Sequence, residues 1–202
     1  MEKGGLASAL AAAGLHADDQ VGWADEMRVG LRGTTRRVWG RRGVPVRQVV
    51  QFTYEWRHLF VVVNGRAGRV HWAWLPNLKA ETLAAAVGGL GRGQTELAAV
   101  VWDRAPAHRD ERMRPFARQQ GLAVIEQPPY APELNPAERL IEEIRRAVEG
   151  KVYPTLEEKV AAVDAFLEQL DADPARLQRL AGWDWIAVAL RQLPASPRPI
   201  AA

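Results

Sequence analysis

The sequence contains no cysteine, and only four histidines occur among its 202 residues. The absence of cysteine excludes a disulfide framework, a thiolate nucleophile, an iron–sulfur cluster and a zinc site built on cysteine. No two histidines stand four residues apart, as they do on a zinc-binding helix. A bound metal would therefore be held mainly by carboxylate oxygens, which favour a hard cation such as Mg²⁺ or Mn²⁺.

Long apolar runs are also missing, because no stretch reaches the ~18 residues that a membrane-spanning helix needs. Residues 6–15 loosely resemble a signal peptide, but they are poor in large apolar side chains and follow an acidic residue. We interpret this segment as a short Ala-rich helix or a frayed end. We therefore expect a cytoplasmic protein with no membrane partner.

The composition indicates a folded, mildly basic protein. Hydrophobic residues make up 48% of the chain, which is enough to form a core, and the formal net charge is +3. Such a charge permits a polyanionic partner without requiring one. The chain has 8 tryptophans, and we expect most of them in the core.

Runs rich in β-branched and aromatic residues alternate with helical composition along the chain. We predict strands at 20–25, 49–54, 59–63, 70–75, 97–102 and 123–125, with a Gly- and Arg-rich hairpin and loop over 28–43. The first strands, joined by turns, suggest an antiparallel meander. The later order of helix and strand indicates parallel pairing, and hence an α/β fold with a mixed sheet and helices on both faces.

Helices are predicted at 79–90, 110–120, 135–149 and 155–170, followed by one or two short helical pieces within 173–191. Asn135 is the expected N-cap of the third of these helices, and Pro136 follows it at the first helical position. Thr155 is the expected N-cap of the fourth, with Glu158 completing a capping box. The amphipathic segment 157–170 is suited to packing on the sheet or to forming a homodimer.

Three acidic residues stand where a ligand could reach them. Asp25 ends the first predicted strand, Asp103 follows the most apolar strand, and Glu138 lies in the first turn of a helix. A carboxylate at the end of a buried strand lies at the rim of the sheet, where functional groups of such folds gather. Three converging carboxylates would bind two Mg²⁺ or Mn²⁺ ions, an arrangement suited to phosphodiester chemistry.

Each of these acids also has a purely structural interpretation. Asp25 could simply end a strand, and Asp103 could open a turn. Glu138 stands three residues after Asn135, so its carboxylate could bond back to the Asn135 amide as a capping box and contact no metal.

Two neighbouring glutamates are rivals for these positions. Glu142 lies one helical turn after Glu138 and is the main alternative third ligand. Glu26 adjoins Asp25 but points to the opposite face if the strand continues, so it is not counted as a ligand.

Four stretches, taken in order, resemble the catalytic domain of DDE transposases of the Tc/mariner superfamily, in particular its bacterial insertion-sequence branch. They are WADEMRVGL, RRVWGRRG, VVWDRAPAHR and QPPYAPELNPAERLIEEI. In that family an Asp-Glu pair on a strand, an Asp-Asn-Ala-Pro-x-His motif and a Pro-Pro-Tyr-Ser-Pro-Glu-Leu-Asn-Pro-x-Glu motif supply three metal ligands. Thirty-four residues separate the second and third ligands there, as they do in this sequence.

The resemblance implies an RNase H-like fold in which Asp25, Asp103 and Glu138 bind two Mg²⁺ or Mn²⁺ ions. It also implies hydrolysis of DNA at transposon ends, followed by attack of the freed 3′-hydroxyl on target DNA, usually at a TA dinucleotide. On this basis we divide the chain into an extension (1–19), an RNase H-like catalytic domain (20–150), C-terminal helices (151–193) and a disordered tail (194–202).

Some features depart from the family pattern. Arg104 stands where the family has Asn, and its guanidinium could bind a DNA phosphate or could pair with Asp103 and compete with the metal. Too few residues precede the first motif for the family's helix-turn-helix region, which suggests a separate recognition polypeptide, a remnant or an excised domain. The alternatives are therefore a catalytically inactive, DNA-associated remnant or regulatory product, and an RNase H-like nuclease.

Further candidate DNA contacts surround these motifs. Arg36, Arg37, Arg41 and Arg42 flank Trp39 in a basic segment that could grip phosphates, with Trp39 either stacking on DNA or packing in the core. His108 could orient a phosphate or a water near Asp103, or it could be a satisfied surface residue.

Overall fold

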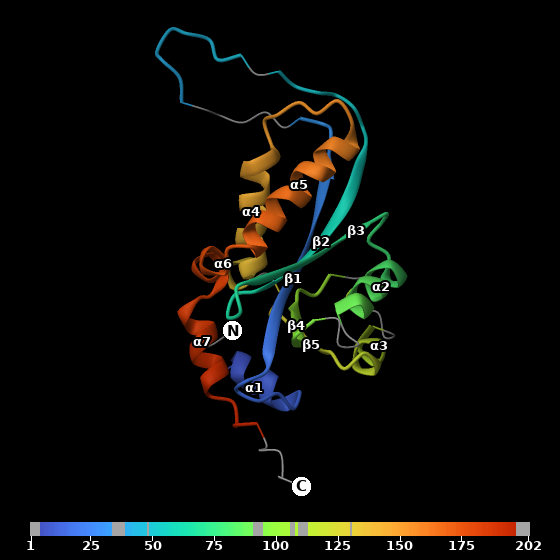
Figure 1. The fold of residues 1–202 in the computed structure, drawn as a ribbon, viewed down its shortest axis with the longest axis vertical. Helices are drawn as coiled ribbons and strands as arrows, with labels where there is room; N and C mark the ends of the chain where they lie inside the picture. Colours follow the sequence, from blue (N-terminus) through green and yellow to red (C-terminus); the bar gives the residue numbers. More distant parts are fainter. Residues whose placement is uncertain are drawn as a thin grey trace.

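A five-stranded sheet lies at the centre of the computed structural model, which describes residues 5–33, 39–47, 49–90, 95–105, 108, 113–129 and 131–196 (Figure 1). The strands are β1 (Gln20–Gly30), β2 (Trp56–Asn64), β3 (Arg69–Leu75), β4 (Leu97–Trp102) and β5 (Ala123–Glu126). Their order in the sheet is β3-β2-β1-β4-β5. The pairs β1–β2 and β2–β3 are antiparallel, whereas β1–β4 and β4–β5 are parallel. The predicted mixed sheet is confirmed.

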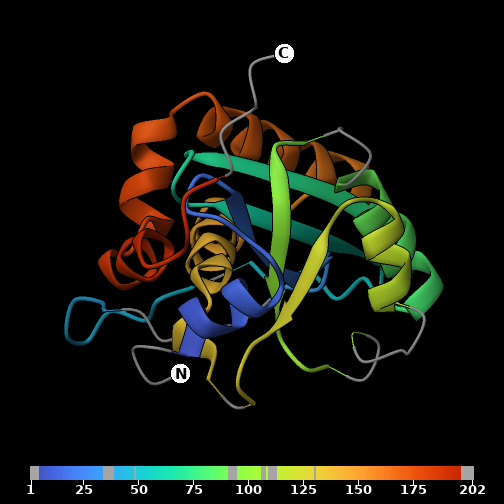
Figure 2. The ribbon, with the colours of Figure 1, turned by 90° about the horizontal axis from the view of Figure 1, so that it is seen from below.

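Helices cover both faces of this sheet, as predicted (Figure 2). One face carries α2 (Ala80–Leu90) and α3 (Met113–Gln119). The other carries α1 (Gly5–Ala12), α4 (Pro136–Val148), α5 (Leu156–Asp171), α6 (Pro174–Ala181) and α7 (Asp184–Arg191). A short 3₁₀ turn, η1 (Pro132–Leu134), precedes α4.

Strand β1 separates the two cores because successive side chains of a strand point to opposite faces. Trp23, Met27 and Val29 are buried in the core beneath α4 and α5. Ala24 is buried in the core beneath α2 and α3. With both faces covered, the middle of β1 has the nearly continuous burial of a central strand.

The strand predicted at 49–54 is wrong, and the meander is instead formed by β1, β2 and β3. β1 runs on to Gly30, into the segment predicted as hairpin and loop. Two backbone bonds continue its pairing with the incoming chain, from Leu31 N to Glu55 O at 3.0 Å and from Gly33 N to Gln51 O at 2.9 Å. Residues 49–54 are exposed or half-buried, and large apolar side chains such as Phe52 are exposed.

The described part of the β1–β2 connection projects beyond the end of the sheet (Figure 1). Trp39 is 103% exposed, so the interpretation that places it in the core is wrong. Arg41 and Arg42 are exposed as well, whereas Arg36 and Arg37 lie outside the described residues. Trp23 and Trp102 are buried in the core as expected, whereas Trp56 is 47% exposed.

Helix α5 packs on the sheet, as its amphipathic pattern predicts. Asp164 on α5 accepts hydrogen bonds from two indole N–H groups of β3, Trp72 Nε1 at 2.9 Å and Trp74 Nε1 at 2.8 Å. The Thr155 side chain accepts from Glu158 N at 3.2 Å and caps the helix as predicted.

Within the described residues no helix has the length and apolar character of a membrane span. Of the tail predicted at 194–202, residues 197–202 lie outside the described residues.

Candidate active site between two parallel strands

The candidate site begins where β1 and β4 part. The two parallel strands pair up to Trp23 and Val101. Asp25 and Asp103 each come two residues later, so they continue the same face of two neighbouring strands. β1 goes on beside β2, whereas β4 ends at Trp102, which leaves an opening between the two carboxylates.

Helix α4 brings the third carboxylate to this opening. Asn135 caps α4 by accepting from Ala137 N at 3.0 Å, as predicted. Its amide also donates to the carbonyl oxygen of Ala24 on β1 at 3.1 Å, an interaction that the sequence analysis missed. Because Asn135 is 3% exposed, this bond is shielded from water and holds the first turn of α4, with Glu138, against β1.

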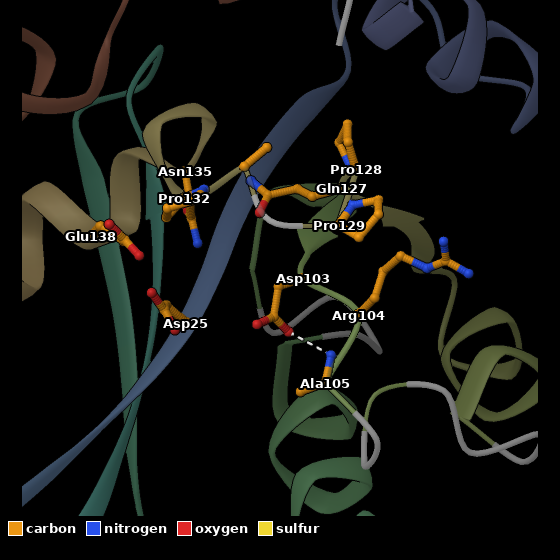
Figure 3. A pocket seen from close by; sticks show the side chains of 11 residues that line it. Asp25, Asp103, Arg104, Ala105, Gln127, Pro128, Pro129, Pro132, Asn135 and Glu138 are labelled. Atoms are coloured by element: carbon orange, nitrogen blue, oxygen red, sulfur yellow. Dashed lines mark hydrogen bonds between the residues drawn. The ribbon is translucent and has the colours of Figure 1, made fainter.

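The three predicted ligands line one pocket of about 490 Å³ (Figure 3). Glu138 and Asp25 point toward one another from one wall, and Asp103 lies across the opening from them. The remaining lining residues are Arg104, Ala105, Gln127, Pro128, Pro129, Ala131, Pro132 and Asn135. Carboxylates from β1, β4 and α4 thus meet in a single cavity.

The capping-box interpretation of Glu138 is wrong. The Asn135 N–H donates to Pro132 O at 2.8 Å, in the 3₁₀ turn before the helix, rather than to the Glu138 carboxylate. The rival Glu142 lies outside the pocket lining and forms exposed ion pairs with Arg139 at 3.3 Å and Arg146 at 3.8 Å. Glu138 is therefore the glutamate of α4 that faces the site.

Asp25 has a carboxyl group with a strongly raised pKa. Burial raises its pKa to about 7, and the charges of Glu26, Asp103 and Glu138 act in the same direction. A hydrogen bond from Glu26 N to Asp25 Oδ1 at 2.8 Å opposes this shift. A carboxylate held in such surroundings gains from a nearby cation.

Asp103 has the opposite environment. His108 Nδ1 lies 2.5 Å from its Oδ1, and this bond lowers the pKa of Asp103. The second ring nitrogen, Nε2, lies 3.2 Å from Glu26 Oε1. Burial alone would lower the pKa of His108, but its bonds to Asp103 and Glu26 raise it to about 9.

The surface position considered for His108 is wrong, because the residue is 5% exposed and sits between two carboxylates. Both ring nitrogens are engaged there, which leaves neither one free for a direct contact with a DNA phosphate. Glu26 points away from Asp25, as the strand alternation predicts, but the sequence analysis missed its contact with His108. The Asp-Glu pair and the Asp-x₄-His spacing were the signals that could have suggested it.

Arg104 does not pair with Asp103. Its Nε lies 3.1 Å from Glu126 Oε2 at the end of β5, and Arg114 binds the other oxygen of the same carboxylate. The competition with metal considered for Arg104 is thus absent from this arrangement. Its side chain is 44% exposed and lines the pocket, where it can meet an anion.

The donor set suits a hard divalent ion, because three carboxylates line the pocket and the half-buried one, Asp25, has a raised pKa. In the described part of the chain, no three His, Asp or Glu side chains lie close enough to hold an ion together. An ion shared by all three carboxylates therefore requires a closer approach of these side chains to one another.

Residues 20–158 match the family model of the DDE superfamily endonuclease. The chain belongs to the DDE superfamily of endonucleases. The matched segment contains all three pocket carboxylates, and the membership in the DDE superfamily predicted from the sequence motifs is confirmed. No curated protein matches the chain.

Solved structures with a similar fold include DNA complexes and the catalytic domain of the mariner transposase Mos1. The Mos1 Strand Transfer Complex has a TM-score of 0.66 at 15% identity and covers 89% of this chain and 56% of its own. The Mos1 paired-end complex with Mg has a TM-score of 0.66 at 13% identity, covering 94% and 59%. The Mos1 catalytic domain has a TM-score of 0.60 at 14% identity, covering 95% and 91%.

These likenesses confirm the predicted RNase H-like fold with its open mixed sheet. The chain spans less than two thirds of the Mos1 chain in the DNA complexes but nearly all of the isolated Mos1 catalytic domain. It is therefore similar in extent to a mariner catalytic domain.

Proposed function

We propose that this chain is the catalytic domain of a Tc/mariner-type transposase that uses two divalent ions, Mg²⁺ or Mn²⁺. It cuts DNA strands at transposon ends and joins the freed 3′-hydroxyl to target DNA, at TA dinucleotides. The observation that carries the proposal is the single pocket lined by Asp25, Asp103 and Glu138 in a DDE fold. Mos1, which has the same fold, has been solved as complexes with Mg and with Mn.

The roles of the three carboxylates follow from their positions. Asp25 and Glu138 face one another and would hold a cation from one wall, while Asp103 would bind from the other. Two ions, when bound, activate the attacking oxygen and stabilise the leaving oxygen of an in-line displacement at phosphorus. The same site can serve for cleavage and for strand transfer, because both are phosphoryl transfers.

Exposed arginines, one at the pocket and others farther away, are the proposed DNA contacts. Arg104 lies at the pocket itself and can bind a phosphate beside the reacting one. Arg41 and Arg42, with Arg36 and Arg37 proposed alongside them, would bind phosphates farther away through the projecting β1–β2 connection. A separate helix-turn-helix polypeptide and a second copy of the chain are the proposed partners.

The proposal is tested by Mn²⁺ binding and by nicking of transposon-end DNA, with and without a helix-turn-helix partner. We expect Asp25→Asn, Asp103→Asn and Glu138→Gln each to reduce nicking by at least about a hundred-fold, because each removes a carboxylate needed for two-ion chemistry. Glu142→Gln is the matched control, since Glu142 lies on the same helix outside the pocket lining, and it should cut like the wild type.

Other results would overturn the proposal. Equal nicking by the wild type and Asp103→Asn would reject the site. Cleavage of RNA–DNA hybrids without any need for transposon ends would indicate an RNase H-like nuclease. Mn²⁺ binding without cleavage of any substrate, even with a recognition partner, would indicate an inactive remnant or a regulatory product.

A further inference from the structure

Glu26 and His108 form a buried chain behind Asp103 that the proposed reaction does not itself use. The Glu26 side chain is 10% exposed, and its Oε1 accepts from Trp102 Nε1 at 3.1 Å. The same oxygen lies 3.2 Å from His108 Nε2. On the far side of the ring, His108 Nδ1 lies 2.5 Å from Asp103 Oδ1.

Contacts with Trp102, Glu26 and Asp103 hold the imidazole of His108 in place. It packs on the indole of Trp102, with the ring centroids 3.9 Å apart and the planes 31° from one another. The side chain is 3% exposed, so neither nitrogen is open to solvent. Rotation of the ring would break both carboxylate contacts in a buried place, which is energetically unfavourable.

This arrangement decides which oxygen of Asp103 is left for a ligand. Oδ1 is 2.5 Å from His108 Nδ1 and also accepts from Ala105 N at 2.9 Å. The other oxygen is turned toward the side of the pocket where Asp25 lies (Figure 3). Two contacts on one oxygen thus select the orientation of the whole carboxylate.

We propose that Glu26 is a positioning residue of the metal site, which acts through His108 to hold the Asp103 carboxylate with one oxygen presented to a divalent ion. The inference rests on the proposed metal site and adds a residue that contacts neither metal nor DNA. Mutation of partners that orient metal ligands commonly weakens metal binding by about 10–100-fold.

Two adjacent residues of β1 therefore have different roles at the site. Asp25 faces the pocket directly. Glu26 points to the other face of the sheet and reaches the ligand of the neighbouring strand, Asp103, by way of His108. A contact with His108 needs an acid immediately after Asp25, because the side chain at that position points to the opposite face of the sheet, where it can reach His108.

The test is a double-mutant cycle on the intact chain, with Mn²⁺ affinity measured by titration calorimetry. Glu26→Gln keeps the shape of the side chain but replaces its charge-assisted bond to His108 with a weaker neutral one. His108→Phe keeps a ring on Trp102 but removes both nitrogens. Each variant should weaken Mn²⁺ binding about tenfold, and the double variant should bind no more weakly than the weaker single one.

The double-mutant cycle distinguishes an effect of Glu26 that is exerted through His108 from a general effect of its negative charge on Mn²⁺ affinity. If Glu26 acted only as a nearby negative charge, the losses would add, and that result would overturn the inference. Unchanged affinity in Glu26→Gln would overturn it as well. Glu142→Gln removes an equal charge from α4 outside the pocket lining and should leave Mn²⁺ affinity unchanged.

A second measurement needs no variant to fold. In wild-type protein labelled with ¹⁵N at histidine, Mg²⁺ should shift the ring signals of His108 but not those of His58 or His71, which lie outside the pocket lining. A His108 spectrum indifferent to Mg²⁺ would reject the coupling. Wild-type protein that binds no Mn²⁺ would instead reject the proposed function, so the two failures are distinguishable.

Discussion

The amide of Asn135 donates to the carbonyl oxygen of Ala24, the residue immediately before Asp25. The same side chain caps α4 through Ala137 N. A helix start and a strand that are distant in sequence are thus joined by one residue. This bond fixes where Glu138 lies relative to Asp25, and the integrity of the site depends on it.

Asn135→Ala should therefore damage both stability and metal binding. It leaves a buried carbonyl and a helix N–H without their partner, which should lower the free energy of unfolding by about 2–3 kcal/mol. Mn²⁺ affinity should fall about tenfold as α4 loses its anchor. Urea unfolding and calorimetry measure the two effects. Thr155→Ala removes the cap of α5 and should lower stability by about 1 kcal/mol with no change in Mn²⁺ affinity.

Asp25→Asn should stabilise the metal-free protein at neutral and higher pH. Because the folded-state pKa of Asp25 is raised to about 7 from 3.8, its contribution to stability is complete below the lower value and is lost as pH rises through the higher one. The gain from Asn should therefore grow across this window and reach about 1–3 kcal/mol above it.

Urea unfolding in the presence of a chelator checks this expectation at both ends of the window. Glu142→Gln, at an exposed position, should show no such pH-dependent gain. A variant Asp25→Asn that is less stable than the wild type at high pH would contradict the expectation.

Asp164→Ala should loosen α5 from the sheet without affecting the site. Two indole N–H groups, those of Trp72 and Trp74, lose their shared acceptor, which should lower the free energy of unfolding by about 2–3 kcal/mol. Tryptophan fluorescence during urea unfolding follows the change. Mn²⁺ affinity should stay within about twofold of wild type, because Asp164 lies outside the pocket lining. A large loss of affinity would show that α5 supports the site.

Arg104→Ala should weaken DNA binding while leaving Mn²⁺ affinity unchanged. The loss of one phosphate contact should reduce the slope of the logarithm of the binding constant against the logarithm of the salt concentration by about one. Fluorescence anisotropy over a series of salt concentrations measures this slope. Arg114→Ala is the matched control, since Arg114 shares Glu126 with Arg104 but lies outside the pocket lining. Equal effects of the two variants would indicate a general loss of charge.

Much of the fold follows from local patterns in the sequence. The apolar run of β4 and the capped start of α4 agree with the structure because continuous burial and N-capping leave clear local signals. The strand predicted at 49–54 failed because β-rich composition does not reveal whether a neighbour is present to cover it. For the same reason, composition could not distinguish the exposed Trp39 from the buried Trp102.

The sequence alone determined the DDE superfamily and was enough to predict the three acids, since Asp25, Asp103 and Glu138 stand in motifs whose residue types and spacing are local properties. Only the tertiary structure decided which contacts form around these acids. Three interactions join residues of different elements or loops. They are the bond from Asn135 to Ala24, the pairing of Arg104 with Glu126 and the contact of His108 with Glu26. Such contacts depend on how the chain packs in three dimensions, and side-chain chemistry at a single position carries no record of that packing.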